Sequence, residues 1–260
     1  MISTAPRLRA DRLLVERGLF DSRARAQAAI AAGLVQANGA TVRKASEEIA
    51  SDAVLTASPA HPYVSRGGVK LAAAFDRFAI VPSGRVCLDV GASTGGFTQV
   101  LVERGARRVH AVDVGRAQLH ASLRDRPEIV SLEETDIRTL PASALAEPPS
   151  LVTIDVSFIS LKQVLPAATA LAAREAALVA LIKPQFEAGR ERVKKGVVRD
   201  AAVHREVCDD IAAFAGSLGW RVLGVIPSPI AGGDGNVEFL LAAEREAEGI
   251  SRHDPGNQRA

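Results

Sequence analysis

The strongest constraint on this chain is a regular alternation of short apolar runs with helical patterns through its second, larger part. Such alternation is typical of a parallel sheet whose helices cover both faces. Seven runs have the length and composition of strands: residues 86–90, 109–113, 129–132, 151–155, 178–182, 222–226 and 237–241. Helical patterns fall between several of them, at 97–104, 161–173 and 201–218. No helix separates the last two runs, so the sequence predicts a mostly parallel, doubly wound α/β sheet of Rossmann-like type, with an antiparallel hairpin at one edge.

The composition agrees with a packed, soluble protein. Of the 260 residues, 47% are apolar and 24% are charged, which excludes wholesale disorder, collagen and coiled coil. The length indicates one or two domains. The 32 basic and 30 acidic side chains leave a net charge of +2, so a polyanionic partner must be recognised by a local basic patch.

Basic residues are concentrated near the amino terminus. Residues 7–44 contain eight Arg or Lys against three acids. Ser22 has the side chain of a helix N-cap, and the Asn38-Gly39 pair between short apolar runs predicts a hairpin. We therefore expect a small basic α+β domain over residues 1–57 that grips phosphates through arginine forks; a merely solvated basic face is the alternative.

Two prolines mark the end of this domain. Pro59 and Pro62 suppress helix and predict an extended linker over residues 58–66. The sheet domain is then expected over residues 67–245. The remaining segment, 246–260, is polar and is expected to be a mobile tail.

The two cysteines and the absence of long apolar stretches bear on the compartment. Cys87 and Cys208 lie far apart without a C-x-x-C spacing, so neither a disulfide scaffold nor a cysteine zinc site is expected. A reducing cytoplasm fits this pattern. The chain begins without the apolar core of a secretory signal, and no stretch approaches the ~20 apolar residues of a membrane span. The sequence predicts a cytoplasmic protein with no membrane partner.

A glycine-rich loop follows the first predicted strand of the sheet domain. It consists of Asp89, Val90, Gly91, Ala92, Ser93, Thr94, Gly95, Gly96 and Phe97. Glycines in this place permit a tight turn and a close approach of the backbone to a ligand. The spacing is neither G-x-G-x-x-G nor that of a P-loop, so a dinucleotide or a nucleoside triphosphate is not indicated.

Three acids around the loop indicate a different ligand. Asp89, ahead of the first glycine, would repel a pyrophosphate but attract the ammonium of an amino acid. Asp113 ends the second predicted strand about 20 residues beyond the glycines, where a carboxylate accepts ribose hydroxyls. Asp136, after the third strand, is placed to reach an adenine. Together with the loop residues 91–97 they predict S-adenosylmethionine as the cofactor; a strained turn without a ligand is the alternative.

A second set of residues carries the chemistry of reaction. Lys183 follows the buried run 178–182, where loss of hydration favours the neutral amine. Asp155 ends a neighbouring strand and is expected in the same crevice. Lys70 and Glu238, the latter expected on the edge strand of the sheet, are further candidates, although spacing alone does not bring them into the site. Each of the four also has an innocent interpretation, as a surface charge or a helix cap.

Five segments, in order along the chain, resemble the TlyA (hemolysin A) family. They are residues 63–71, 89–98, 155–161, 183–187 and 235–238, within a match over about residues 7–243. The resemblance implies a ribosomal RNA cytidine-2′-O-methyltransferase with an FtsJ-like, S-adenosylmethionine-dependent catalytic domain. It also implies an amino-terminal RNA-binding domain of the type named after the fourth small-subunit ribosomal protein. The implied partner is ribosomal RNA of the small subunit, the large subunit or both, within ribosomal subunits.

The resemblance also assigns site residues. The family's Lys-Asp-Lys-Glu tetrad falls on Lys70, Asp155, Lys183 and Glu238, and Asp155 is expected to border the cofactor as well. RNA contacts are expected from a set of basic residues: Arg9, Arg23, Arg25, Lys44 and Arg66. The linker carries Tyr63 where some members carry Trp, which is a departure from the pattern.

The tetrad is chemically sensible for attack by a ribose hydroxyl. That hydroxyl is a poor nucleophile and needs a positioned base, for which we assign Lys183 in its neutral form. Lys70, as a second cation, would favour that neutral form and stabilise developing negative charge, and Asp155 and Glu238 would orient the lysines. A sulfonium is already a good leaving group, so no metal is expected. Phe158 either stacks on the target base or packs.

Three other functions compete with this one: methylation of a base, at an amine or at carbon; ribosome binding without catalysis; and membrane lysis. Methylation of an exocyclic amine usually goes with an Asn/Asp-Pro-Pro-aromatic motif, which Asp155-Val156-Ser157-Phe158 lacks. Carbon methylation of a pyrimidine needs a thiolate, and both cysteines are expected to be buried. A non-catalytic ribosome-binding factor would not need the complete tetrad. A membrane-lytic protein would need an amphipathic or pore segment, and none is apparent.

Overall fold

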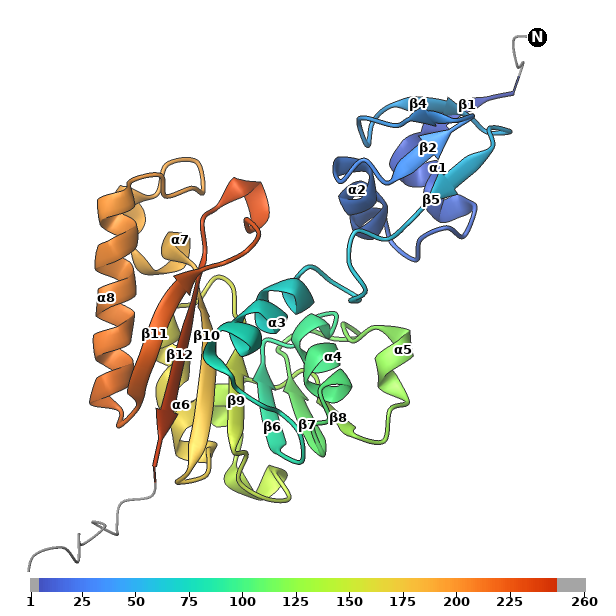
Figure 1. Cartoon of the computed structure of the whole chain (residues 1–260). Helices are drawn as coiled ribbons and strands as arrows, with labels where there is room; N and C mark the ends of the chain where they lie inside the picture. The colour runs from blue at the N-terminus through green and yellow to red at the C-terminus, as the bar shows by residue number, and fades with distance from the viewer. Residues whose placement is uncertain (1–4, 247–260) are drawn as a thin grey trace, which may run out of the picture. The chain divides into compact units, whose positions relative to one another are not determined.

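The computed structural model describes residues 5–246, which divide into two compact units between Pro62 and Tyr63 (Figure 1). Each unit has its own apolar core: one over residues 8–57, and a pair of cores on the two faces of the large sheet. The tail expected over residues 246–260 lies, apart from Glu246, outside the described residues.

The first unit consists of two helices and short strands. The helices are α1 (Ala10–Glu16) and α2 (Arg23–Ala31). The strands are β1 (Arg7–Arg9), β2 (Val35–Ala37), β3 (Ala40–Thr41), β4 (Glu48–Ala50) and β5 (Leu55–Ala57). β1 pairs with β4, and β2 lies between β3 and β5, all antiparallel.

Local signals of the first unit behave as predicted. The Ser22 side chain caps α2 by accepting a hydrogen bond from the Arg25 N–H. Asn38 and Gly39 both have positive φ, at 50° and 79°, and turn the β2–β3 hairpin as the Asn-Gly pair predicts. The sequence analysis missed β1, β4 and β5, because strands of three residues are too short to show a period.

The second unit is built on a seven-stranded sheet within residues 63–246. Its strands are β6 (Val86–Val90), β7 (Arg108–Val112), β8 (Ile129–Leu132), β9 (Leu151–Ile154), β10 (Ala176–Ile182), β11 (Arg221–Pro227) and β12 (Phe239–Arg245). Their order is β11-β12-β10-β9-β6-β7-β8. Pairing is parallel from β10 to β8, whereas β12 runs antiparallel to both of its neighbours. The predicted fold class is confirmed.

The position of β12 corrects one expectation. The sequence analysis placed Glu238 on the edge strand, but β12 lies inside the sheet between β10 and β11, and β11 is the edge. The β11–β12 hairpin joins the sheet through its second strand, because β12 is the more apolar: Leu240, Leu241, Ala242 and Ala243 are fully buried.

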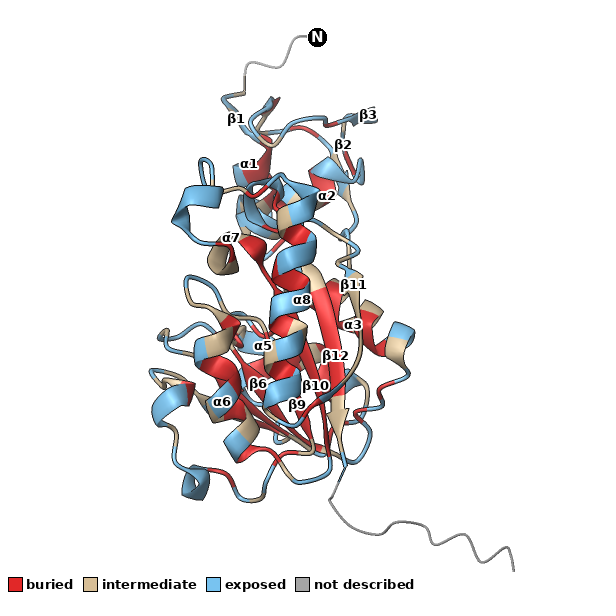
Figure 2. Ribbon diagram, turned by 90° about the vertical axis from the view of Figure 1, so that its left-hand side faces the viewer, coloured by how far each residue is buried: buried red, intermediate tan, exposed pale blue. Residues whose placement is uncertain are grey.

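Helices cover both faces of the sheet. They are α3 (Gly67–Phe78), α4 (Gly96–Glu103), α5 (Ala121–Arg124), α6 (Leu161–Leu171), α7 (Pro184–Glu187) and α8 (Ala201–Ser217). Single 3₁₀ turns cover Ile137–Thr139, Ala142–Ala144, Arg190–Arg192 and Gly233–Gly235. Figure 2 shows the buried strands lying behind α6 and α8. None of the helices within residues 5–246 is long and apolar enough to cross a bilayer.

The alternation of side chains along each strand divides the core into two layers. On β10, Leu178 and Ile182 pack with α6 and α8, whereas Val179 and Leu181 pack with α3 and α4. Both faces of β10 are therefore dry, which explains why its sequence is a continuous apolar run rather than an alternating one.

The boundary between the units, after Pro62, falls within the predicted linker of residues 58–66. Tyr63 and Val64 pack against the core formed by α3 and α4, and the Val64 N–H donates to Gln99 Oε1 at 2.7 Å. Gly68 leaves room for the Tyr63 ring, since a Cβ there would lie 2.3 Å from Tyr63 Cγ. Residues 63–66 thus belong to the second unit, and the glycines that open α3 hid this helix from sequence analysis.

Candidate active site

Strand register brings the candidate residues to one edge of the sheet. Val90 pairs with both Val112 and Ile154 in parallel, so the residues that follow β6, β7 and β9 emerge side by side. Ligands bind at this carboxyl edge in doubly wound folds. Ile182 pairs with Phe239 in the antiparallel ladder, so Lys183 and Glu238 are also neighbours there.

The four expected catalytic residues form two ion pairs. Lys70 Nζ lies 2.5 Å from Glu238 Oε2, and Lys183 Nζ lies 2.6 Å from Asp155 Oδ1. The Lys70, Lys183 and Glu238 residues are only 8%, 9% and 3% exposed, so most of the hydration of these charges is replaced by their partners. The structure therefore brings together all four residues.

Ser157 joins this group, and sequence analysis did not find it. Its Oγ accepts a hydrogen bond from Lys183 Nζ at 2.8 Å. A hydroxyl two residues beyond an acid at a strand end was the available signal, but serine is common in such loops. Asp155 and Ser157 thus hold the Lys183 amine from two sides of one loop.

A tight glycine-containing loop carries Glu238 to Lys70. The Ser228 N–H donates to the Glu238 carbonyl at 2.8 Å, and the Gly232 N–H donates to the Asn236 carbonyl at 2.8 Å. A Cβ on Gly232 would lie 2.0 Å from Glu238 Oε1. The buried Asn236 side chain ties this loop to the Gly196 carbonyl at 3.0 Å. The glycine therefore lets the carboxylate lie against its own loop.

Two cavities open at this edge of the sheet. One, of about 420 Å³, has acids and apolar side chains in its lining, among them Asp113, Asp136 and Ile137. The other, of about 260 Å³, is lined by Lys70, Lys183 and the glycine-rich loop. Gly91, Ser93, Asp155 and Ser157 border both cavities. The two spaces therefore meet at the residues that hold Lys183.

The close approach of β6 to β9 requires Gly91. Its φ is 81°, and a Cβ there would lie 2.4 Å from the Asp155 carbonyl oxygen. Ala92, Ser93, Thr94, Gly96 and Phe97 line the smaller cavity. Gly95, with φ 94°, lines neither cavity, since a Cβ there would meet Leu123 at 2.4 Å.

Asp89 is placed differently from the expectation. It lies on the α4 side of β6 and is fully buried, with Oδ2 accepting from Thr98 Oγ1 at 2.6 Å and Oδ1 from Thr153 Oγ1 at 2.9 Å. It lines neither cavity. Burial raises the pKa of Asp89 to about 7, although the hydrogen bonds from the two threonine hydroxyls act to lower it. In place of a direct ammonium contact, this carboxyl group links β6, α4 and β9 beneath the loop.

Asp113 and Asp136 border the larger cavity, where the sequence placed them. Asp113 Oδ2 accepts from the Ser93 N–H at 2.8 Å, and its Oδ1 accepts from the Gly115 N–H at 2.7 Å. Asp136 accepts from Arg138 Nε at 3.0 Å, and hydrogen bonding by this guanidinium lowers the pKa of Asp136 below its ordinary value. Each oxygen of Asp113 keeps a further lone pair, whereas both oxygens of Asp136 are engaged by Arg138.

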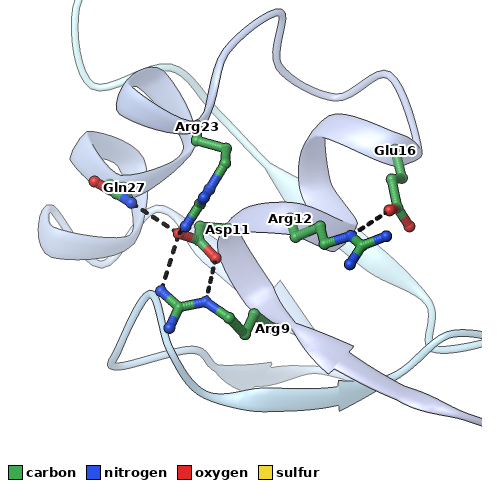
Figure 3. A network of polar contacts seen from close by, with 6 residues as sticks. All are labelled: Arg9, Asp11, Arg12, Glu16, Arg23 and Gln27. Atoms are coloured by element: carbon green, nitrogen blue, oxygen red, sulfur yellow. Dashed lines mark hydrogen bonds and ion pairs between the residues drawn. The ribbon is translucent and has the colours of Figure 1, made fainter.

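In the first unit, two of the predicted RNA-binding arginines, Arg9 and Arg23, share one acid (Figure 3). Arg9 Nε lies 3.1 Å from Asp11 Oδ1, Arg23 Nη2 lies 2.7 Å from Asp11 Oδ2, and Gln27 Nε2 donates to Oδ2 at 2.7 Å. Asp11 is fully buried. The hydrogen bonds that it accepts from these guanidiniums hold its pKa well below the usual range, and the bond from Arg9 has the largest effect. The arginine side chains stay 48% and 58% exposed.

The other predicted RNA contacts are dispersed. Arg25 pairs with Asp21 at 2.7 Å, and Lys44 is exposed on the same unit. Arg66 belongs to the second unit and lines the smaller cavity. No group of three or more His, Cys, Asp and Glu side chains between residues 5 and 246 is arranged to hold a metal ion.

Comparison with known proteins agrees with this geometry. Residues 63–245 match the FtsJ-like methyltransferase family, and residues 8–55 match the S4 domain. The 16S/23S rRNA (cytidine-2′-O)-methyltransferase TlyA of Mycobacterium tuberculosis is 45% identical over 240 residues, which is 91% of this chain and 90% of that protein. This chain belongs to the TlyA family. The predicted family and the predicted methyltransferase class are confirmed.

Two further relatives match this chain over nearly its whole length, one in sequence and one in structure. Hemolysin A of Brachyspira hyodysenteriae is 37% identical over 235 residues, 90% of this chain and 98% of that protein. A solved structure of a protein from Streptococcus thermophilus superposes with a TM-score of 0.74 at 41% identity, covering 93% of this chain and 90% of the other. The S4 and methyltransferase domains thus occur together in these relatives.

Proposed function

We propose that this methyltransferase transfers a methyl group from S-adenosylmethionine to the 2′-hydroxyl of a cytidine in ribosomal RNA. The observation that carries the proposal is the pair of buried lysine–carboxylate contacts beside the cavity that the glycine-rich loop lines. The named activity of the Mycobacterium tuberculosis relative supports the choice of nucleotide. Ribosomal subunits as the partner imply a cytoplasmic location.

The residues around the larger cavity fit S-adenosylmethionine. Asp113 has lone pairs left for ribose hydroxyls, and Asp136 and the apolar Ile137 line the part of the cavity that we assign to the adenine. Asp89 supports the loop from below. When bound, S-adenosylmethionine supplies a methyl carbon activated by a positively charged sulfur.

Lys183 acts as the base. Its neutral amine takes the proton of the ribose hydroxyl at Nζ, which increases the nucleophilicity of the oxygen. Asp155 and Ser157 fix the position of Nζ through contacts of 2.6 Å and 2.8 Å. The carboxylate also stabilises the ammonium that forms when Nζ holds the proton.

Lys70 supplies a second positive charge at the smaller cavity. The ion pair with Glu238 fixes the Lys70 side chain, which still lines the smaller cavity. A cation there stabilises negative charge on the attacking oxygen. Glu238 is therefore a positioning residue for Lys70.

RNA binding is assigned to both domains. In the S4 domain, Arg9 and Arg23 offer guanidinium groups on a common carboxylate, and Arg25 and Lys44 add positive charge. Arginine forks match phosphate oxygens. In the methyltransferase domain, the Phe158 residue is 91% exposed at the rim of the larger cavity, where its ring is free to stack on a base.

The geometry disfavours carbon methylation. Burial raises the pKa of Cys87 to about 12 and that of Cys208 to about 11, so neither is a thiolate near neutral pH. Neither cysteine lines the two cavities.

The decisive experiment is methyl transfer from labelled S-adenosylmethionine to ribosomal subunits that lack the modification. Alkaline hydrolysis follows, because a 2′-O-methyl group blocks cleavage of the adjacent phosphodiester. Label in an alkali-resistant dinucleotide that contains cytidine is expected. Label on the base of a mononucleotide would contradict the proposal, and absence of transfer to either subunit would favour a non-catalytic ribosome-binding factor.

A further inference from the structure

The loop over residues 155–161 is attached at both of its ends to the short segment 183–187. At the first end, Lys183 Nζ contacts Asp155 and Ser157. At the far end, Glu187 Oε2 accepts from Ser160 Oγ at 2.5 Å, and Glu187 Oε1 accepts from the Leu161 N–H at 2.8 Å. The mechanism uses Lys183 and leaves Glu187, four residues later, without a role.

Glu187 caps a helix to which it does not belong. Helix α6 begins at Leu161, and Ser160 is its N-cap, whose side chain accepts from the Lys162 N–H. The first N–H groups of a helix have no partner inside it, and a carboxylate at this end is stabilised by the helix dipole. Glu187 supplies that carboxylate from α7, so the start of α6 is fixed to the segment that carries the catalytic lysine.

Nearby charges act on Glu187 in opposite directions. Burial raises its pKa, the hydrogen bonds from Ser160 and Leu161 lower it, Lys162 on α6 lowers it and Asp210 on α8 raises it. Lys162 and Asp210 act in opposite directions and are themselves paired at 2.5 Å. The net result is a raised pKa for Glu187, with burial as the largest cause. Protonation of the Glu187 carboxylate therefore occurs closer to neutrality than for an exposed glutamate.

The loop between the two attachments is held in an unfavourable conformation. Phe158 has φ 64°, in the left-handed region that bulky side chains avoid. Its ring lies 5.1 Å from that of Phe186, which belongs to the same segment as Glu187. Such a conformation persists only where the surroundings enforce it. Ser157, which borders both cavities, is its neighbour.

We propose that Glu187 is a positioning residue of the active site: its ionised carboxylate fixes the far end of loop 155–161 and so sets where Ser157 and Phe158 stand relative to Lys183. The inference rests on the proposed function, since its readout is methyl transfer to RNA. Loss of the carboxylate frees the start of α6 and lets Phe158 leave its strained conformation. Misplacement of positioning groups by about 1 Å is enough to cost roughly a hundredfold in rate.

The test compares Glu187→Gln with Glu191→Gln as a matched control. The Glu191 side chain is 76% exposed, and its ion-pair contact is to Arg192 at 3.9 Å. The amide that replaces the Glu187 carboxylate has one acceptor oxygen for the two donors, Ser160 Oγ and the Leu161 N–H. We therefore expect kcat/KM for ribosomal RNA to fall about tenfold. The Tm should stay within about 2 °C of the wild type. The control should match the wild type. Ser160→Ala removes the shared contact from the other partner and also the side-chain cap of α6, so the effects of the two substitutions on kcat/KM should be less than additive in the double variant.

The pH profile separates positioning from a general structural effect. Wild-type activity loses the ionised Glu187 as the pH falls, whereas the glutamine variant has no such group. The ratio of wild-type to variant kcat/KM should therefore shrink toward acidic pH. A constant ratio with a lowered Tm, or wild-type kinetics in both Glu187→Gln and Ser160→Ala, would overturn the inference alone. A wild-type protein that methylates no ribose would overturn the proposed function together with it.

Discussion

Asp11 in the S4 domain and Asp89 in the methyltransferase domain are both completely buried, but their pKa values are shifted in opposite directions. Asp11 of the S4 domain receives two guanidiniums and an amide (Figure 3), and its pKa is held well below the usual range. Asp89 of the methyltransferase domain receives two threonine hydroxyls, and its pKa is raised to about 7. Neither side chain is accessible to solvent, but the guanidinium partners outweigh burial at Asp11, whereas burial outweighs the hydroxyl partners at Asp89.

The difference in pKa between Asp11 and Asp89 agrees with the functions proposed for the two domains. A fully charged Asp11 holds arginines whose outer N–H groups remain exposed, which suits a surface for phosphates. Asp89 lies under a loop expected to receive a positively charged cofactor, with no cation among its hydrogen-bond partners. The two buried lysines of the methyltransferase domain pair instead with Asp155 and Glu238, at the cavities.

The largest effect is expected where a cation is removed from the catalytic domain. Lys183→Met should lower kcat by about a thousandfold, because the base is lost while the methionine stem preserves packing. Binding of S-adenosylmethionine, measured by calorimetry, should change little. Lys162→Met, which removes an exposed lysine paired with Asp210, is the control. Near-normal turnover of Lys183→Met would remove Lys183 from the mechanism.

The next largest effect should appear in the S4 domain. Asp11→Ala removes the shared acceptor of Arg9, Arg23 and Gln27, and we expect a loss of about 3 kcal/mol of domain stability. Hydrogen exchange of peptides within residues 7–57, followed by mass spectrometry, reports it. Asp21→Ala breaks the more exposed pair with Arg25 and should cost at most about 0.5 kcal/mol. Equal effects in both variants would mean that burial of the acid is unimportant.

The comparison predicts opposite pH dependences for the two acids. Asp11 has a lowered pKa, so its stabilisation is complete above about pH 4 and is lost only as the pH falls toward its folded pKa. Asp89 has a raised pKa of about 7, so the folded state binds the extra proton between about pH 4 and pH 7. Stability of the methyltransferase domain should therefore decrease as the pH rises through that window.

Asp89→Asn tests the second of these signs. The variant has no proton to lose, so the decrease of about 2 kcal/mol expected between pH 5 and pH 7 in the wild type should disappear. Denaturant unfolding followed by fluorescence of Trp220, the single tryptophan, measures the methyltransferase domain. An unchanged slope in the variant would show that Asp89 is ionised throughout.

The smallest effect is expected from one hydroxyl. Thr98→Val removes the 2.6 Å donor to Asp89 and should cost about 1 kcal/mol at pH 6, with a larger loss at pH 8. The ionised carboxylate depends more on that donor than the neutral acid does, so the variant should extend the decrease in stability above pH 7. A loss that is independent of pH would mean that the hydroxyl contributes only packing.

Much of the fold was predictable because its signals are local. The predicted runs 86–90 and 129–132 coincide with β6 and β8, and the Ser22 cap and the Asn-Gly turn behave as predicted. The family and the methyltransferase class also followed from contiguous motifs. Contacts between distant segments were predicted less well: Thr98 and Asn236 carried no signal of their own, and the signal of Ser157, a hydroxyl just beyond an acid, is too common to select it.

Local signals along the chain were sufficient to predict the seven strands of the large sheet, the glycine-rich loop and the four charged candidates, since each depends on neighbouring residues. Which of these side chains pair depends on the fold. Lys70 meets Glu238 across 168 residues only because β12 inserts antiparallel between β10 and β11. Tertiary structure also decided that Asp89 faces two hydroxyls and Asp11 two guanidiniums, because the charge state of a buried acid depends on neighbours that the fold brings from elsewhere in the chain.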